Sequence, residues 1–324
     1  MRNFQTLDNQ LMQTPRGLFC GVSSFACHNS GELQGINLDR RNKLKTLAGD
    51  FIPAYIETER RKNKYSVEFF KSGAVKAVAL NEQEEAATPI GRLPAEMLTF
   101  FESGELCRLF PSDGKISGFW SEEDERGMQI PLSLDLGFTR FTARISSICF
   151  HQSGCIRSSA LFPGEAIDVP TKYGAVESRN GVSLYESGEL ESLEPLRPTG
   201  IATPIGVLSA YDPLAIGISA DRNSLGFYRN GEVARLIAAG NRIAVQTPDG
   251  QVHQCKPRRT PHMTQDGMEQ IAGLPVAFKS DGTIEIGRSR FAISKCIFSI
   301  GEEDADGQDY ACSPSDCMNC LLCR

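Results

Sequence analysis

The chain lacks the short motifs that mark common catalytic sites. Its 324 residues contain no Gly-x-Ser-x-Gly elbow, no phosphate-binding Gly-x4-Gly-Lys-Ser/Thr loop, no His-Glu-x2-His pair and no Rossmann glycine fingerprint. Carboxylates are spread through expected loops, and no two of them stand out as an acid and a base. A site assembled from residues distant in sequence would leave no such trace. These absences favour a protein that is not an enzyme without excluding one.

Long apolar runs are missing as well. No segment approaches the roughly 18 residues that a transmembrane helix needs, and residues 1–17 lack the apolar core of a signal peptide. We therefore expect a cytoplasmic protein with no membrane partner. The net charge of −6 argues against a surface devoted to nucleic acid, while 40% hydrophobic and 23% charged residues are typical of a folded globular chain.

What the sequence does contain is a recurring hairpin motif, clearest at residues 100–106 (FFESGEL). An apolar or aromatic pair precedes two turn residues, the second usually Ser, Asn or Asp; a glycine follows, and Leu, Ile or Val stands two residues later. This pattern predicts a tight turn between two strands, with the glycine at positive φ. Seven such motifs surround Gly31, Gly73, Gly104, Gly154, Gly188, Gly231 and Gly282.

The motifs belong to an internal duplication. Gly73 and Gly188 lie 115 residues apart, and each is followed at the same distance by Ala-Thr-Pro-Ile-Gly, at residues 87–91 and 202–206. The motif pairs on either side repeat in the same order with slightly different offsets. We predict a first β-repeat copy at 1–143 (units around Gly31, Gly73 and Gly104), a second at 144–300 (units around Gly154, Gly188, Gly231 and Gly282), and an acidic linker with a Cys-rich tail at 301–324.

Apolar residues follow the turn glycine at positions two and five, as in Val75 and Val78. Strict strand alternation would place them at two and four, so the spacing predicts a β-bulge after each turn. A short helix is expected only within residues 261–273. The predicted fold is all-β, a tandemly duplicated meander of short β-hairpins forming an extended or twisted sheet. The alternative is a seven-bladed β-propeller, because seven motifs recur about every 40 residues.

The motifs ending at Leu106, Leu190 and Val233 resemble the MORN-type repeat proteins and their bacterial variants. The resemblance extends discontinuously over residues 20–300. It implies an extended meandering sheet that acts as a scaffold or as a binding surface, and therefore a protein partner.

A cysteine cluster ends the chain at Cys312, Cys317, Cys320 and Cys323. The spacing Cys-x4-Cys-x2-Cys-x2-Cys suits one tetrahedral Zn²⁺ or an iron–sulfur cluster. The first three cysteines resemble the ligand loop of plant-type ferredoxins, in which the fourth ligand lies far downstream. The alternative is an exposed tail of reducible thiols that holds no metal.

Other candidate groups favour structural roles. His28 and His151 occupy the aromatic position of their motifs, where a flat ring is required, although a pair of ligands is conceivable. His253, Cys255 and His262 form a weak candidate metal set. Three basic clusters, at residues 40–45, 60–64 and 256–259, could bind phosphate but are expected to be solvated loops.

Three functional hypotheses follow. The first is a non-enzymatic β-repeat scaffold or protein-binding module. The second is a metal- or iron–sulfur-binding protein that uses the C-terminal cysteines. The third is a β-propeller enzyme with polar residues around a central channel.

Overall fold

The structure is a computed structural model that describes residues 5–61, 65–117, 119–215, 223–261 and 269–302. It divides into two compact units, the first formed by Met1–Leu132 and Arg144–Ser159, the second by Ser133–Ala143 and Ala160–Arg324. Nineteen of the described strands join in one antiparallel sheet, which confirms the all-β hairpin meander. A propeller would divide them among separate blades, so that alternative is wrong. The predicted boundary between the repeat copies stays a prediction.

The elements of the first unit are β1 (Gln5–Thr14), β2 (Gly17–Cys27), β3 (Leu33–Leu38), β4 (Leu44–Thr46), β5 (Gly49–Phe51), β6 (Val67–Phe69), β7 (Val75–Thr88), β8 (Gly91–Phe100), β9 (Leu106–Phe110), α1 (Glu122–Met128) and β12 (Ile145–Phe150). Two strands contain a unit boundary, β10 (Leu132–Asp135) and β13 (Ile156–Leu161). The second unit holds β11 (Arg140–Ala143), β14 (Ala166–Thr171), β15 (Gly174–Leu184), β16 (Leu190–Pro195), β17 (Thr199–Thr203), β18 (Gly206–Ala210), β19 (Leu225–Phe227), β20 (Val233–Ala238), β21 (Asn241–Gln246), β22 (Val252–Cys255), β23 (Arg258–Pro261), β24 (Glu269–Ala272), β25 (Leu274–Phe278), β26 (Thr283–Ile286), β27 (Ser289–Ala292), the 3-10 helix Ile293–Lys295 and β28 (Ile297–Glu302).

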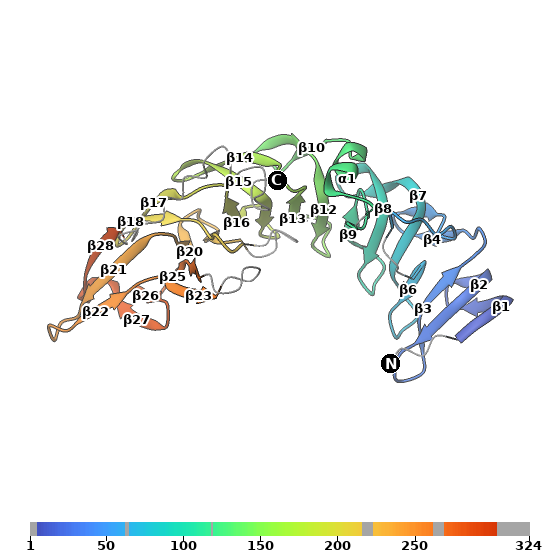
Figure 1. Cartoon of the computed structure of the whole chain (residues 1–324), viewed down its shortest axis with the longest axis horizontal. Helices are drawn as coiled ribbons and strands as arrows, with labels where there is room; N and C mark the ends of the chain where they lie inside the picture. The colour runs from blue at the N-terminus through green and yellow to red at the C-terminus, as the bar shows by residue number, and fades with distance from the viewer. Residues whose placement is uncertain (1–4, 62–64, 118, 216–222, 262–268, 303–324) are drawn as a thin grey trace. The chain divides into compact units, whose positions relative to one another are not determined.

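The first unit is built on an antiparallel meander. Strands β2, β3, β6, β7, β8, β9 and β12 pair in that order, and β1 pairs with β2 (Figure 1). One residue from each strand after β2 enters a row of directly opposed side chains, and every member has 0% exposure. This row forms the centre of the core: Ile36, Val67, Val78, Leu98, Leu109 and Ile148.

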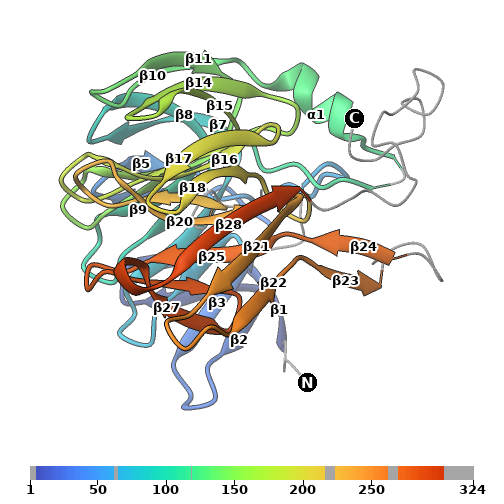
Figure 2. The same cartoon turned by 90° about the vertical axis from the view of Figure 1, so that its left-hand side faces the viewer.

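The second unit repeats this arrangement. Strands β15, β16, β19, β20, β25, β26 and β27 pair in order. The corresponding buried row consists of Val182, Leu193, Leu225, Leu236, Val276 and Ile286. A separate three-stranded sheet places β21 between β22 and β28 (Figure 2). Each meander is thus held by apolar rows that run across the strands rather than along them.

All seven hairpin motifs adopt one turn geometry. Their glycines have φ between +77° and +106°, as predicted. In the motif at Gly104, the Phe101 amide donates to the Glu105 carbonyl and the Gly104 amide donates back to the Phe101 carbonyl, both at 2.9 Å. The other six motifs have the same pair of bonds. A glycine is needed here because L-residues with a side chain are strained at positive φ.

The predicted bulge follows the turn in five motifs, those at Gly31, Gly73, Gly104, Gly188 and Gly231. The motif at Gly282 supplies the test of the spacing rule. Its buried residues Ile284 and Ile286 stand two and four positions after the glycine, and the ladder of β25 with β26 runs without a register shift. The position of the second apolar residue therefore decides whether a bulge forms.

A second set of turns, the Thr-x-x-Gly hairpins, packs against turns of the hairpin motifs. In each, the threonine hydroxyl donates to the glycine carbonyl at 2.6–2.9 Å. Three of them, at residues 14–17, 88–91 and 203–206, have a proline directly after the threonine. Two more, at residues 46–49 and 171–174, lack this proline.

In four of the five Thr-x-x-Gly hairpins, the residue after the threonine lies over the glycine of a hairpin motif. A Cβ atom on Gly73 would lie 2.5 Å from Cγ of Pro15, and Leu47, Pro89 and Lys172 stand in the same place over Gly104, Gly154 and Gly231. The two sets of turns are therefore stacked in a regular way.

The expectation of a short helix within residues 261–273 is wrong for the described part of that range. Arg258–Pro261 and Glu269–Ala272 pair instead as strands β23 and β24. Among the described residues, the one α-helix is α1. The Ser121 hydroxyl caps it by accepting the Asp124 amide, and the Asp124 carboxylate accepts the Ser121 amide. This Ser-x-x-Asp capping box, followed by an acidic first turn, was the available sequence signal.

Candidate functional site

The predicted ligands do not form a site among the described residues. The tail cysteines Cys312, Cys317, Cys320 and Cys323 and also His262 lie outside them. No group of three or more potential metal ligands occurs in the part of the chain that the structure describes. His28 contacts the Phe69 carbonyl through Nε2 at 3.2 Å, and His253 packs against the ring of Phe291. Both contacts agree with the structural roles favoured by the sequence.

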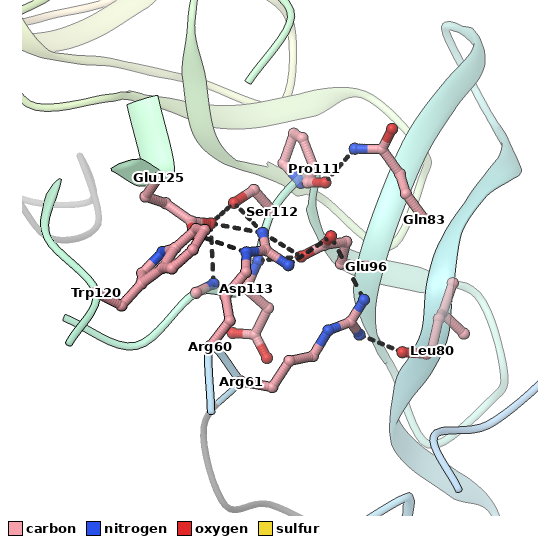
Figure 3. A network of polar contacts seen from close by, with 11 residues as sticks. Arg60, Arg61, Leu80, Gln83, Glu96, Pro111, Ser112, Asp113, Trp120 and Glu125 are labelled. Carbon is pink, nitrogen blue, oxygen red and sulfur yellow. Dashed lines mark hydrogen bonds and ion pairs between the residues drawn. The ribbon is translucent and has the colours of Figure 1, made fainter. Parts of the chain in front are cut away.

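A buried charge network occupies the first unit instead (Figure 3). Arg60 donates from Nη1 and Nη2 to the two oxygens of Glu96, each at 2.9 Å. It also donates from Nε and Nη2 to the two oxygens of Glu125, at 3.0 and 2.8 Å. Glu96 and Glu125 are both 4% exposed. One guanidinium thus joins a carboxylate of β8 to a carboxylate of α1.

The remaining lone pairs of the two carboxylates are also occupied. Glu96 accepts the Asp113 amide at 2.8 Å and lies 3.4 Å from Arg61 Nη2. Glu125 accepts Trp120 Nε1 at 2.7 Å, the Gly114 amide at 3.0 Å and the Ser112 hydroxyl. Gly114 is required at this point, since an added Cβ would overlap the Glu125 carboxylate.

The geometry makes this network a structural clamp. Burial lowers the pKa of Arg60, but hydrogen bonds to Glu96 and Glu125 outweigh it and raise that pKa overall. Every oxygen of both carboxylates already has at least two donors, so neither is placed to take a proton from a substrate. The expectation that residues 60–64 form a solvated loop is wrong for Arg60 and Arg61, which are largely buried and paired.

The clamp holds the segment between β9 and β10 at Ser112, Gly114, Trp120 and Glu125. This segment carries four exposed large apolar side chains, Ile116, Phe119, Met128 and Ile130. Phe119 is 89% exposed although it directly precedes the anchored Trp120. Exposed carboxylates of Glu122, Glu123 and Asp124 stand between them on α1. We call the described residues 116–117 and 119–130 the clamped segment.

Sequence reasoning missed this site because its parts are distant in the chain. Glu96 and Glu125 lie 36 and 65 residues after Arg60. A local signal existed only in the acidic, capped helix with aromatic residues just before it.

Comparison with known proteins adds no relative: no family model, no curated protein and no solved structure matches the chain. Within the described residues, no helix has the length and apolar character needed to cross a membrane.

Proposed function

We propose that this protein is a non-enzymatic cytoplasmic scaffold that binds another protein through the clamped segment. The observation that supports the proposal most directly is the exposure of Phe119 beside Trp120, which is half-buried and held by Glu125. Large apolar side chains in water are unfavourable, and a local group of them marks interaction surfaces. The MORN-like resemblance of the repeats points to the same class of function.

Rigidity strengthens the proposal. An aromatic anchor that is already held in place loses little conformational entropy on binding, which is why preorganised aromatic residues dominate interface energetics. The Arg60 network holds Glu125, which in turn holds Trp120, and the Ser121 capping box holds the first turn of α1. The carboxylates of α1 favour a partner with basic residues at the rim of its apolar patch.

The test compares two double variants. Phe119→Ser with Ile130→Ser removes exposed apolar side chains of the clamped segment. Leu11→Ser with Leu18→Ser removes exposed apolar side chains elsewhere in the first unit. Partners captured by the wild-type protein are identified and purified, and their affinities are measured by calorimetry. We expect about tenfold or greater weakening for the first variant only, because each lost anchor is worth about 1 kcal/mol or more.

Two results would contradict the proposal. Equal loss of affinity in both variants would mean that the partner is captured by nonspecific hydrophobic association rather than by the clamped segment. A wild-type dimer that dissociates only in the Phe119 variant would assign the surface to a second copy of the chain.

A further inference from the structure

The second unit contains a cavity of about 510 Å³ that is independent of the clamped segment. It lies between two Thr-x-x-Gly hairpins (171–174 and 203–206) and two hairpin-motif turns (at Gly231 and Gly282). Its volume falls in the range that holds small organic ligands. The stacking of the two sets of turns therefore leaves a space at this point.

Two tyrosine rings line the cavity and are fixed in place. The Tyr173 hydroxyl accepts the Val233 amide at 3.0 Å, and its ring stacks on Phe227 with centroids 6.5 Å apart. The Tyr228 hydroxyl donates to the Phe278 carbonyl at 2.5 Å. Because both hydroxyls are engaged by backbone, the rings supply apolar surface to a ligand.

Two lysines line the same cavity. Lys172 lies 3.2 Å from Glu232, and Lys279 lies 2.9 Å from Glu285. Their side chains are 53% and 39% exposed, and exposed ion pairs of this kind are weak. An anionic ligand can therefore compete for both ammonium groups. Hydrogen bonding from Lys172 lowers the pKa of Glu232, so that carboxylate is the internal competitor.

The duplication provides an internal comparison. Lys172 covers Gly231 as Leu47 covers Gly104 in the first unit. Tyr173 then corresponds to Ala48, and Lys279 corresponds to His151 in the motif that follows Gly104. The first unit forms the same stacked turns with Leu, Ala and His. The two lysines and the tyrosine are therefore not needed to build this part of the fold.

We infer that this cavity binds a small organic anion that carries a flat apolar ring. The anionic group lies between Lys172 and Lys279, and the ring packs against Tyr173 and Tyr228. Lysine recognises carboxylate and phosphate alike as a point charge, so the shared chemistry is an aromatic anion of either kind.

The test uses 1-naphthyl phosphate as the probe, with 1-naphthol and inorganic phosphate as its two halves. Dissociation constants are measured by calorimetry on the full chain. We expect saturable binding of the probe and at least about tenfold weaker binding of either half, since both contacts are required. Lys172→Met with Lys279→Met is expected to weaken probe binding about tenfold or more. Glu232→Gln is expected to strengthen it, because the competing carboxylate is removed.

Lys43→Met with Lys76→Met is the matched control, because those lysines form similar exposed ion pairs with Asp50 and Glu68 in the first unit. It is expected to leave affinity for the probe unchanged. The inference is overturned if the probe does not saturate by about 5 mM, if 1-naphthol binds as tightly as the probe, or if the control variant loses as much affinity as the cavity variant. Thermal melting followed by circular dichroism confirms that each variant is folded.

Discussion

Arg60 lies 65 residues before Glu125 in the chain, yet its Nε and Nη2 atoms donate to both oxygens of that carboxylate, at 3.0 and 2.8 Å. Removing the guanidinium would leave Glu96 and Glu125 as buried charges without their main partner. We expect Arg60→Met to destabilise the first unit by about 3–5 kcal/mol, the usual cost of breaking a buried pair from one side.

Urea denaturation measures this loss, and Trp120 makes the experiment specific. It is the single tryptophan of the chain, and its Nε1 donates to Glu125 at 2.7 Å. Its emission should shift to longer wavelength in Arg60→Met before global unfolding. The exposed Arg41→Met serves as the control and should change stability by less than about 0.5 kcal/mol. An unchanged unfolding midpoint in Arg60→Met would show that the network does not hold the segment.

The stacked turns predict that replacing two equivalent glycines by alanine destabilises the protein to different extents. Gly73 and Gly104 both have positive φ, at +80° and +106°. An alanine at either position is strained by about 1–2 kcal/mol. At Gly73 the new Cβ would also lie 2.5 Å from Cγ of Pro15, whereas at Gly104 the nearest atom, Cδ1 of Leu47, is 3.5 Å away.

We therefore expect Gly73→Ala to cost at least about 1 kcal/mol more than Gly104→Ala, because overpacking adds to the backbone strain. Chemical denaturation of the two variants provides the comparison. Equal costs would mean that the Thr-x-x-Gly hairpin at residues 14–17 does not pack against the motif at Gly73. In a Pro15→Gly background, which removes the atoms that the new Cβ would meet, Gly73→Ala should no longer carry this extra cost.

Glu194 should make the second unit sensitive to pH. It is 1% exposed, and burial raises its pKa even though Ser224 donates to it through its amide and hydroxyl. A carboxyl with a raised folded pKa binds its proton more tightly in the native state. The contribution of Glu194 to the free energy of unfolding is therefore greatest below the pKa that it has in the unfolded chain. It is lost as pH rises through the pKa that it has in the folded protein.

Relative to the wild type, Glu194→Gln should gain stability as pH rises from about 4 to about 8. Urea midpoints at several pH values test this, with the exposed Glu186→Gln as the control. A difference between wild type and Glu194→Gln that is independent of pH would show that the pKa of Glu194 is the same in the folded and unfolded states.

The cysteine tail remains a prediction of the sequence. If Cys312, Cys317, Cys320 and Cys323 hold Zn²⁺ or an iron–sulfur cluster, anaerobically purified protein should contain stoichiometric zinc, or iron with sulfide and visible absorbance. A truncation ending at Ala311 should contain none. Cys20→Ser, which alters a cysteine in β2, is the control that should keep the metal. Equal metal content in the full chain and the truncation would exclude the tail as the binding site.

The sequence by itself determined the turns and the strands between them. Positive-φ glycines, turn residues and the spacing of apolar positions act over fewer than about ten residues, so their physics can be read from a short stretch of chain. The seven motif turns and the bulges after five of them follow from such local patterns. Even the helix α1, which we did not predict, carried a local signal in its capping box.

Only the tertiary structure decided the clamp and the cavity. Arg60 appears in the sequence as part of a basic run, and its partners become visible only when β8 and α1 pack on the same loop. Lys172 and Lys279 likewise lie on separate hairpins that folding brings to one cavity. Contacts between distant residues depend on how elements pack, and the free energy of that packing is absent from any local pattern.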